Sequence, residues 1–365
     1  MNKASAVGTH GGVCIVTGGA GFIGTAVSKA LADSFEQVIA VDNLHPQIHE
    51  RPVRPAALDK RVKLVKADVT DAKAWDELFA TSQPDVVIHL AAETGTGQSL
   101  SESTRHATVN VVGTSQMLDA MMRHSVFPSR IVLTSSRAIY GEGAWRRKDD
   151  STVFYPPQRT RMTLEDGQWD VPGAEPLPTS AATTFPAPVS VYGATKLAQE
   201  HMLGAWAKSL GVEAVVLRLQ NVYGPGQSLA NPYTGIMSLF CRMAKAGRSI
   251  PLYEDGNVRR DFVIIDDVAR AVHVAATIAV APIGPVDIGS GEHQTIALAA
   301  QLIAEHYGAP QPHVTGQFRE GDVRHAWADV AHASEVLRWS PRVSLREGIH
   351  SLATWIDAQE SIPGL

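Results

Sequence analysis

Tyr192 and Lys196 stand four positions apart in the segment SVYGATK (190–196), which runs on into a pattern with helical spacing. On a helix, residues four apart project from one face, and an ammonium group beside a phenol favours the phenolate. A free phenol has a pKa of about 10, so the lysine and a further positive charge must lower it together before Tyr192 can act near neutral pH. The pair therefore predicts a general base.

A glycine triplet suggests what lies beside this base. Gly18, Gly21 and Gly24 follow the apolar run VCIVT at the point where a helical pattern begins. Gly18 permits a tight turn, Gly21 lets a pyrophosphate approach the backbone, and Gly24 lets helix and strand pack closely. Asp42 ends the next apolar run, where a carboxylate accepts hydrogen bonds from the adenosine ribose and repels a 2′-phosphate. These residues predict NAD rather than NADP, the alternative being that Asp42 is a plain turn residue.

The elements that must position these residues are visible as short apolar runs that alternate with helical patterns. Helical spacing occurs over 24–33, 72–81 and 104–124. The alternation predicts an α/β fold, with a doubly wound parallel sheet of the Rossmann type. The six predicted strands are VCIVT (13–17), QVIAVD (37–42), KLVKAD (63–68), DVVIHLAA (85–92), RIVLTSS (130–136) and EAVVLRL (213–219).

Residues 141–188 interrupt the alternation. They show no sustained period and contain seven prolines among scattered aromatic residues. A long irregular segment inside a regular domain is more often a functional cover or binding loop than an idle connection. Its basic run, 146–148, is followed at once by two aspartates, which favours a solvated loop over an anion site.

Composition narrows the possible partners. The chain has 365 residues, of which 44% are hydrophobic and 19% charged, so it can bury a large core. A formal net charge of −5 gives no electrostatic footprint for nucleic acid or an anionic membrane surface. The longest stretch of small apolar residues, 269–284, is broken by Arg270, His273 and Pro282, which favours a packed helix over a membrane span. We expect no nucleic-acid or membrane partner.

The cysteines and the amino-terminal residues indicate a compartment. Cys14 and Cys241 are the only cysteines, too few for a disulfide framework or a four-ligand zinc site. The first twelve residues lack an apolar segment of the kind a signal peptide needs, so they are predicted to form a mobile tail. We expect a cytoplasmic protein with two buried thiols and no bound metal.

Ten motifs occur in an order that identifies a family. From Val13 to about Pro341, the chain resembles the extended short-chain dehydrogenases/reductases, in particular their NAD-dependent nucleotide-sugar epimerases. The resemblance implies an NAD-binding domain of residues 11–222 and about 258–288, with 141–188 inserted. It also implies a smaller C-terminal substrate-binding lobe of 223–257 and 289–365, and a homodimer formed through helices near 104–124 and 192–210. The motifs are TGGAGFIG (17–24), VDNL (41–44), ADVTD (67–71), HLAA (89–92), VNVVGT (109–114), TSSRAIYGEG (134–143), YGATK (192–196), RLQNVYGPG (218–226), RRDFVIIDDVARA (259–271) and REGDVRHAWAD (319–329).

Carried over by position, the resemblance assigns roles to individual residues. Ser136, Tyr192 and Lys196 become the catalytic residues, and the nucleotide sugar becomes the substrate. For each arginine among the implied substrate contacts, the alternative is an ion pair within the protein and no contact with substrate. The implied NAD contacts are Gly18, Gly21, Phe22, Ile23, Gly24, Asp42, Asn43, Asp68, Val69, Leu90, Ala91, Ala92, Tyr192 and Lys196. The implied substrate contacts are Ser136, Arg137, Tyr192, Asn221, Arg260, Arg319 and Arg324.

Departures from the family pattern narrow the reaction. The 4,6-dehydratases carry Asp and Glu directly after the catalytic hydroxyl, whereas this chain has Arg137 and Ala138, so we expect no dehydration. The GDP-fucose-forming reductases carry a cysteine in that stretch, and this chain has none there. The segment HLAAETGTGQS (89–99) and the long insertion are most similar to those of dTDP-L-rhamnose 4-epimerases.

The expected reaction is inversion at C4 of the hexose through a 4-keto intermediate that turns over in the site. Tyr192 would take the proton of the 4-hydroxyl, with Ser136 bridging that oxygen and Lys196 holding the cofactor ribose. Other substrates stay open, namely UDP-glucose, UDP-N-acetylglucosamine and UDP-uronic acids. A net NAD-dependent dehydrogenase or reductase would use the same residues, and a cofactor-sensing protein could share the fold.

Overall fold

The computed structural model describes residues 11–229, 231, 235–281 and 284–359. Most of the predicted amino-terminal tail and Pro282 lie outside the described residues. The rest of the predicted packed helix is present as α9 (Ile265–Thr277). Within the described ranges, no helix is both long and apolar enough to span a membrane.

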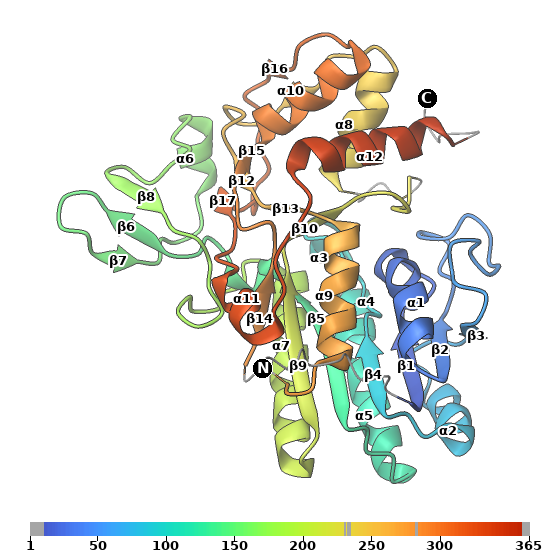
Figure 1. Ribbon diagram of the computed structural model, residues 1–365. Coiled ribbons are helices and arrows are strands. Elements are labelled where there is room, and N and C mark those ends of the chain that lie inside the picture. The colour runs from blue at the N-terminus through green and yellow to red at the C-terminus, as the bar shows by residue number, and fades with distance from the viewer. Residues whose placement is uncertain (1–10, 230, 232–234, 282–283, 360–365) are drawn as a thin grey trace, which may run out of the picture.

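A parallel sheet of seven strands forms the centre of the molecule (Figure 1). Its order is β14-β9-β5-β4-β1-β2-β3, so the chain moves outward in one direction from β1 and in the other from β4. In such a sheet, ligands bind where the order reverses, at the carboxyl ends of the strands. The strands are β1 (Val13–Thr17), β2 (Gln37–Asp42), β3 (Lys63–Lys66), β4 (Val86–His89), β5 (Arg130–Ser136), β9 (Glu213–Leu219) and β14 (Val286–Ile288). All six predicted strands are in this sheet, which confirms the doubly wound fold, although β3 and β4 end earlier than their apolar runs.

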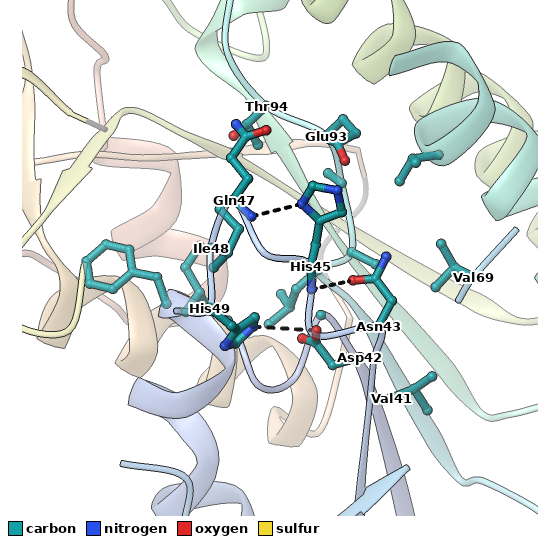
Figure 2. A pocket seen from close by; sticks show the side chains of 18 of the residues that line it. Val41, Asp42, Asn43, His45, Gln47, Ile48, His49, Val69, Glu93 and Thr94 are labelled. Carbon is teal, nitrogen blue, oxygen red and sulfur yellow. Dashed lines mark hydrogen bonds and ion pairs between the residues drawn. The ribbon is translucent and has the colours of Figure 1, made fainter. Parts of the chain in front are cut away.

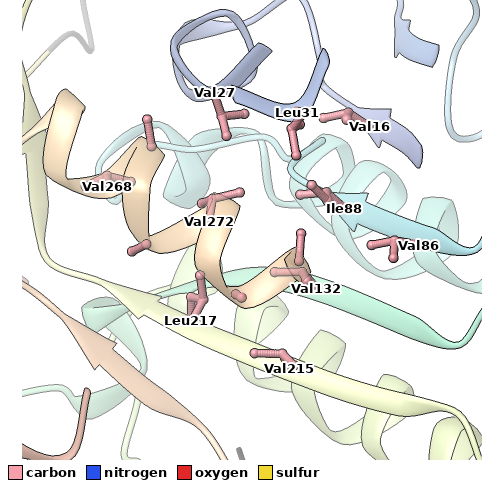
Figure 3. Packing of buried hydrophobic residues seen from close by; sticks show 14 of the residues in the cluster. Val16, Val27, Leu31, Val86, Ile88, Val132, Val215, Leu217, Val268 and Val272 are labelled. Carbon is pink, nitrogen blue, oxygen red and sulfur yellow. The ribbon is translucent and has the colours of Figure 1, made fainter. Parts of the chain in front are cut away.

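Helices cover both faces of the sheet. On one face, α1 (Phe22–Ser34) packs beside α9, and their aliphatic side chains interleave with those of the strands (Figure 3). The other face is covered by α2 (Ala72–Thr81), α5 (Gly113–Arg123) and α7 (Val191–Leu210). Strands buried on both faces explain why the apolar runs are continuous rather than alternating.

The helical pattern over 104–124 is interrupted in the structure. It comprises α4 (Ser103–Ala107), a π-helical turn (Thr108–Val112) and α5, preceded by the short α3 (Gln98–Ser101). A π turn shifts the register of the side chains that follow, and such turns often occur at functional sites. The predicted helix is therefore present, and the π turn within it is a feature that the sequence analysis missed.

A second hydrophobic cluster lies beyond the carboxyl ends of the strands. It is built mainly from α8 (Ile236–Lys245), α10 (Ile296–Tyr307) and α12 (Leu345–Asp357). Short strands run below these helices, and α11 packs beside β14 (Figure 1). These elements are β10 (Asn221–Tyr223), β11 (Pro251–Leu252), β12 (Arg259–Arg260), β13 (Phe262–Ile264), β15 (Gln294–Thr295), β16 (His313–Val314), β17 (His325–Ala326) and α11 (Ala331–Leu337).

The segment 141–188 is more regular than its sequence indicated. It contains an antiparallel sheet of three short strands and one helical turn, α6 (Arg161–Glu165), which project from the side of the molecule (Figure 1). The strands are β6 (Trp145–Arg147), β7 (Val153–Phe154) and β8 (Ala174–Pro176). Strands of two or three residues carry too short a pattern to be read from sequence, so the prediction of a mostly irregular segment missed this small sheet.

Candidate active site

The glycine turn lies between β1 and α1, where the strand order reverses. Gly18 has a φ of +63°, and a Cβ added there would lie 2.8 Å from the backbone nitrogen of Ala91. A Cβ at Gly24 would lie 2.5 Å from the carbonyl oxygen of Gly19. No side chain caps the amino terminus of α1. The uncapped amino terminus of α1 therefore presents its first backbone N–H groups to an anion, and the turn before it leaves no room for side chains at these two glycines.

A cavity opens directly beyond this turn. Asp42 faces it and is 8% exposed (Figure 2). Its carboxylate accepts hydrogen bonds from the backbone nitrogens of Ala20 (3.0 Å) and Leu44 (2.9 Å), which hold it at the rim. A carboxylate has more acceptor sites than these two, so it can also accept from ribose hydroxyls. The predicted residues that line the cavity are Gly18, Gly21, Phe22, Ile23, Asp42, Asn43, Val69, Leu90, Ala91 and Ala92.

These residues fit a dinucleotide such as NAD. The glycine turn matches a pyrophosphate and Asp42 matches an adenosine ribose. Four of the predicted contacts are not in the cavity lining, namely Gly24, Asp68, Tyr192 and Lys196. Gly24 lies against the backbone of Gly19, and Asp68 accepts a hydrogen bond from Asn43 Nδ2 at 2.9 Å. The loop after β2 adds lining residues that the sequence analysis missed, including His45, Gln47 and His49.

The three predicted catalytic residues come together from two elements. Ser136 ends β5, and its hydroxyl also caps the following turn by accepting from the backbone nitrogen of Ala138 (3.1 Å). Tyr192 and Lys196 lie in the first turns of α7, which Ser190 caps by accepting from the backbone nitrogen of Gly193 (3.0 Å). The Ser136 hydroxyl lies close enough to the Tyr192 phenol to favour its ionised form.

Burial controls the electrostatics of this trio. It raises the pKa of Tyr192, while the Ser136 hydrogen bond and the charge of Arg137 oppose that rise. Burial also lowers the pKa of Lys196 to about 7, against the favourable charge of Glu200. The pKa of Tyr192 is therefore raised by burial, and the groups that oppose this rise are Ser136 and Arg137.

Asn110 anchors the catalytic helix, and the sequence analysis missed it. Its side-chain nitrogen donates to Thr195 Oγ1 at 2.9 Å and to the backbone oxygen of Glu93 at 3.0 Å. Its side-chain oxygen accepts from the backbone nitrogen of Glu93 at 2.8 Å. Asn110 is fully buried in the π-helical turn, which aims its amide at both partners. The role of Asn110 depends on the π turn, and no sequence pattern predicts such a turn.

Two of the four predicted substrate arginines lie close to each other, and one of them, Arg137, lies near Tyr192. Arg137 Nε donates to Asn221 Oδ1 at 2.6 Å, and Arg260 donates to the backbone oxygens of Val323 and Arg324. Burial, followed by the charge of Arg137, lowers the pKa of Arg260 to about 9. Neither guanidinium forms an ion pair within the described part of the chain. Two neighbouring guanidinium groups that form no ion pair among the described residues favour the binding of an anion.

The other two arginines have different surroundings. Arg319 is exposed and stacks on the ring of Tyr253, with its guanidinium carbon 5.2 Å from the ring centroid. Arg324 is 1% exposed and pairs with three carboxylates, on Asp170, Glu254 and Asp255. Its donors are therefore already engaged, and this geometry favours the ion-pair alternative over a substrate contact for Arg324.

The fold and the site define a class of enzyme. A glycine turn at the switch point of a parallel sheet, followed by a buried Ser–Tyr–Lys set, is the arrangement of the short-chain dehydrogenases/reductases. Comparisons with known proteins agree with this class. The family model described as the NAD dependent epimerase/dehydratase family matches residues 14–162 and 170–289.

Individual relatives agree as well. The chain is 56% identical over 362 residues to a dTDP-L-rhamnose 4-epimerase of Burkholderia thailandensis, covering 99% of both chains. A UDP-glucose 4-epimerase of Thermotoga maritima, solved with UDP-glucose, has a TM-score of 0.78 at 28% identity, covering 94% of this chain and 98% of that one. A UDP-glucose 4-epimerase of Thermus thermophilus, solved with NAD, has a TM-score of 0.73 at 27% identity. The match covers 95% of this chain and 99% of that one.

The chain therefore belongs to the NAD-dependent epimerase/dehydratase family. The match confirms the predicted fold class, the NAD cofactor and the assignment to NAD-dependent nucleotide-sugar 4-epimerases.

Proposed function

We propose that the protein interconverts dTDP-L-rhamnose and dTDP-6-deoxy-L-talose by inverting C4. The observation that carries the chemistry is the placement of the Ser136 hydroxyl beside the Tyr192 phenol, with the buried Lys196 one helical turn away. The observation that favours this sugar is the identity of 56% to a dTDP-L-rhamnose 4-epimerase along almost the whole chain. The solved UDP-glucose 4-epimerases are about half as similar in sequence.

In this proposal the chain holds the cofactor at the glycine turn and at Asp42, with Lys196 directed at its second ribose. When bound, NAD accepts and returns a hydride and contributes a positive charge next to Tyr192. That charge favours the phenolate, which burial alone opposes. The phenolate takes the proton of the sugar 4-hydroxyl while Ser136 donates a hydrogen bond to the same oxygen. Tyr192 then gives the proton back when the ketone is reduced.

Inversion requires the hexose to turn while the nucleotide stays fixed. Arg137 and Arg260 are proposed to hold the diphosphate, and Asn221 positions Arg137. Arg319 is proposed to lie near the nucleotide. Guanidinium groups suit this task because they bind phosphate through paired hydrogen bonds. Binding energy at this remote part can fix the substrate without restraining the sugar ring. Arg324 is proposed to hold the segment 141–188 in place, and that segment is proposed to cover the sugar.

The quaternary state and location are part of the proposal. Hydrophobic side chains are exposed next to the proposed dimer helices, at Val112, Met122, Phe127 and Leu210. Phe127 also lies 6.5 Å from Trp206 of α7, measured between ring centroids. These residues support a homodimer formed through α4, α5 and α7. Both cysteines are buried free thiols, which supports the cytoplasm as the location.

The test is incubation of purified protein with dTDP-L-rhamnose and trace NAD, followed by NMR of the anomeric and H4 protons. We expect signals of the talose configuration to appear without accumulation of NADH. UDP-glucose, UDP-N-acetylglucosamine and a UDP-uronic acid are run in parallel. Conversion of one of these alone would discard the proposed sugar, whereas NADH produced in proportion to substrate would indicate a net dehydrogenase.

A further inference from the structure

Two loops that the proposed chemistry does not use meet beside the cofactor cavity. One is the loop after β2, and the other is the segment 89–99, whose sequence HLAAETGTGQS departs from the usual family pattern. Gln47 of the first loop and Gln98 of the second lie 51 positions apart and contact each other through their side-chain amides. The contact joins loops on either side of β1 at the carboxyl edge of the sheet.

The Gln47 amide uses all of its hydrogen-bonding capacity. Its nitrogen donates to Gln98 Oε1 at 3.0 Å and to Asn231 Oδ1 at 3.3 Å. Its oxygen accepts from Gln98 Nε2 at 3.2 Å and from Arg105 Nη2 at 3.0 Å. A carboxamide has two donor hydrogens and two acceptor lone pairs, so each one is matched. Full pairing of a surface-loop glutamine is costly in side-chain entropy and indicates a fixed position.

This contact forms part of the cavity wall. Gln47, Glu93, Thr94 and Arg105 all line the cavity, and Gln98 lies behind them at 3% exposure. Figure 2 shows Gln47, Glu93 and Thr94 at one end of the cavity, with Asp42 at the other. The amide pair therefore closes the wall opposite the residue expected to hold the adenosine ribose.

Arg105 connects the amide pair to the catalytic helix. Besides Gln47, it pairs with Glu93 Oε1 at 2.8 Å and with Glu102 Oε2 at 2.8 Å. The backbone of Glu93 is in turn bound by Asn110, which also holds Thr195 of α7. The cavity wall and the Tyr192 helix thus belong to one continuous hydrogen-bonded network.

We propose that the Gln47–Gln98 amide pair is a clasp that keeps the cofactor bound throughout the catalytic cycle. Gln47 and Gln98 are positioning residues, because they act on cofactor retention and not on the reacting atoms. An epimerase needs this, since a cofactor lost in its reduced form at the ketone stage leaves the enzyme unable to complete the turnover. A dehydrogenase has the opposite need, because it must exchange its cofactor in every cycle. The clasp concerns the cofactor alone and does not depend on which sugar is the substrate.

The test uses Gln47→Leu and Gln98→Leu, which keep side-chain size and remove the amide. Protein loaded with NADH is mixed with excess NAD, and the dissociation of NADH is followed by its fluorescence. We expect each variant to release NADH at least about tenfold faster than the unchanged protein, since several paired hydrogen bonds are lost. The fraction of protein purified with bound cofactor should fall in parallel. In the double variant the two effects should not add, because the amides act on each other.

Gln301→Leu is the matched control, since its amide contacts only Glu305 on the exposed side of α10. It should leave the release rate unchanged. A Gln47→Leu protein that is less heat-stable but releases NADH at the original rate would show that the pair is only structural and overturn the proposal. If that variant does not fold, the NADH release rate of Gln47→Asn replaces it, because the shorter side chain withdraws the amide from Gln98. Release at the original rate would again overturn the proposal.

Discussion

Arg137 Nε donates to Asn221 Oδ1 over 2.6 Å, although the two residues lie 84 positions apart. One follows Ser136 at the end of β5 and the other follows β9, the neighbouring strand of the sheet. The contact fixes the guanidinium of Arg137 beside the catalytic tyrosine and leaves its other nitrogens free of any ion pair among the described residues. A buried cation held in this way is suited to a phosphate group.

Replacement of Arg137 by methionine should therefore weaken the binding of dTDP. A charge-assisted hydrogen bond contributes about 1.5–3 kcal/mol, so the dissociation constant measured by calorimetry should rise about 10-fold to 100-fold. Arg61→Met provides the control, because Arg61 is a half-exposed arginine that precedes β3 and has no part in the proposed site. Equal dTDP affinities for the Arg137 variant and the unchanged protein would remove Arg137 from the proposed substrate site.

Replacement of Tyr192 by phenylalanine should nearly abolish epimerisation. General acid–base catalysis contributes about 10² to 10⁴-fold, and Tyr192 is the phenol that lies beside Ser136. The rate of dTDP-L-rhamnose conversion is measured by NMR, together with cofactor content to show that the cavity is intact. Tyr307→Phe serves as the control, because the Tyr307 hydroxyl donates to the backbone oxygen of Ala353 on α12. Turnover above about a tenth of the original rate would exclude Tyr192 as the general base.

Replacement of Asp42 by serine should reduce the preference for NAD over NADP. The carboxylate is held at the cavity rim by two backbone nitrogens, where its charge repels a 2′-phosphate. We expect the ratio of the two dissociation constants to move toward NADP by about tenfold, which corresponds to about 1.4 kcal/mol. Asp33→Asn is an exposed control on α1. An unchanged ratio would favour the alternative that Asp42 is only a turn residue.

Lys196 should make the stability of the protein depend on pH. Burial lowers its pKa to about 7, from an ordinary value of 10.5, so the unfolded chain binds more protons at this residue between those two pH values. The contribution of Lys196 to the free energy of unfolding therefore increases as pH rises through that window. Lys196→Met should lose this increase, measured by urea unfolding at pH 7, 8 and 9. Lys208→Met, on the exposed end of α7, should keep it; the same pH slope in both variants would contradict the prediction.

Arg324 and Arg319 should separate stability from binding. Arg324→Met leaves Glu254, 4% exposed, without one of its two ion-pair partners and should lower the free energy of unfolding by about 3–5 kcal/mol. Arg319→Met should cost little stability, because the side chain is exposed. Its effect should be on dTDP affinity instead. Urea unfolding and calorimetry of both variants measure the two effects, and a stable Arg324 variant with weakened dTDP binding would reverse the assignment.

Much of the fold could be predicted because its signals are local. A buried parallel strand is a continuous apolar run, and a glycine turn needs glycines at fixed spacing. Short stretches of sequence are therefore enough to predict the six strands and the phosphate-binding turn. Tyr192 and Lys196 also lie on one helix, where their spacing alone brings them to one face. Strands of two or three residues, such as β7 and β8, carry no such signal and form only because β6 lies between them.

The tertiary structure decided what depends on contacts between distant segments. Four arginines looked alike in the sequence, yet Arg324 pairs with carboxylates 69 to 154 positions away, while Arg137 and Arg260 form no ion pair within the described residues. In the same way, only folding shows that Ser136 and Arg137 act on the pKa of Tyr192, or that Gln47 meets Gln98. The sequence determined which chemical groups were present and which element carried each one. Their charges, partners and accessibility were set by how the loops at the strand ends meet, since electrostatic and hydrogen-bond energies depend on distance in space and not along the chain.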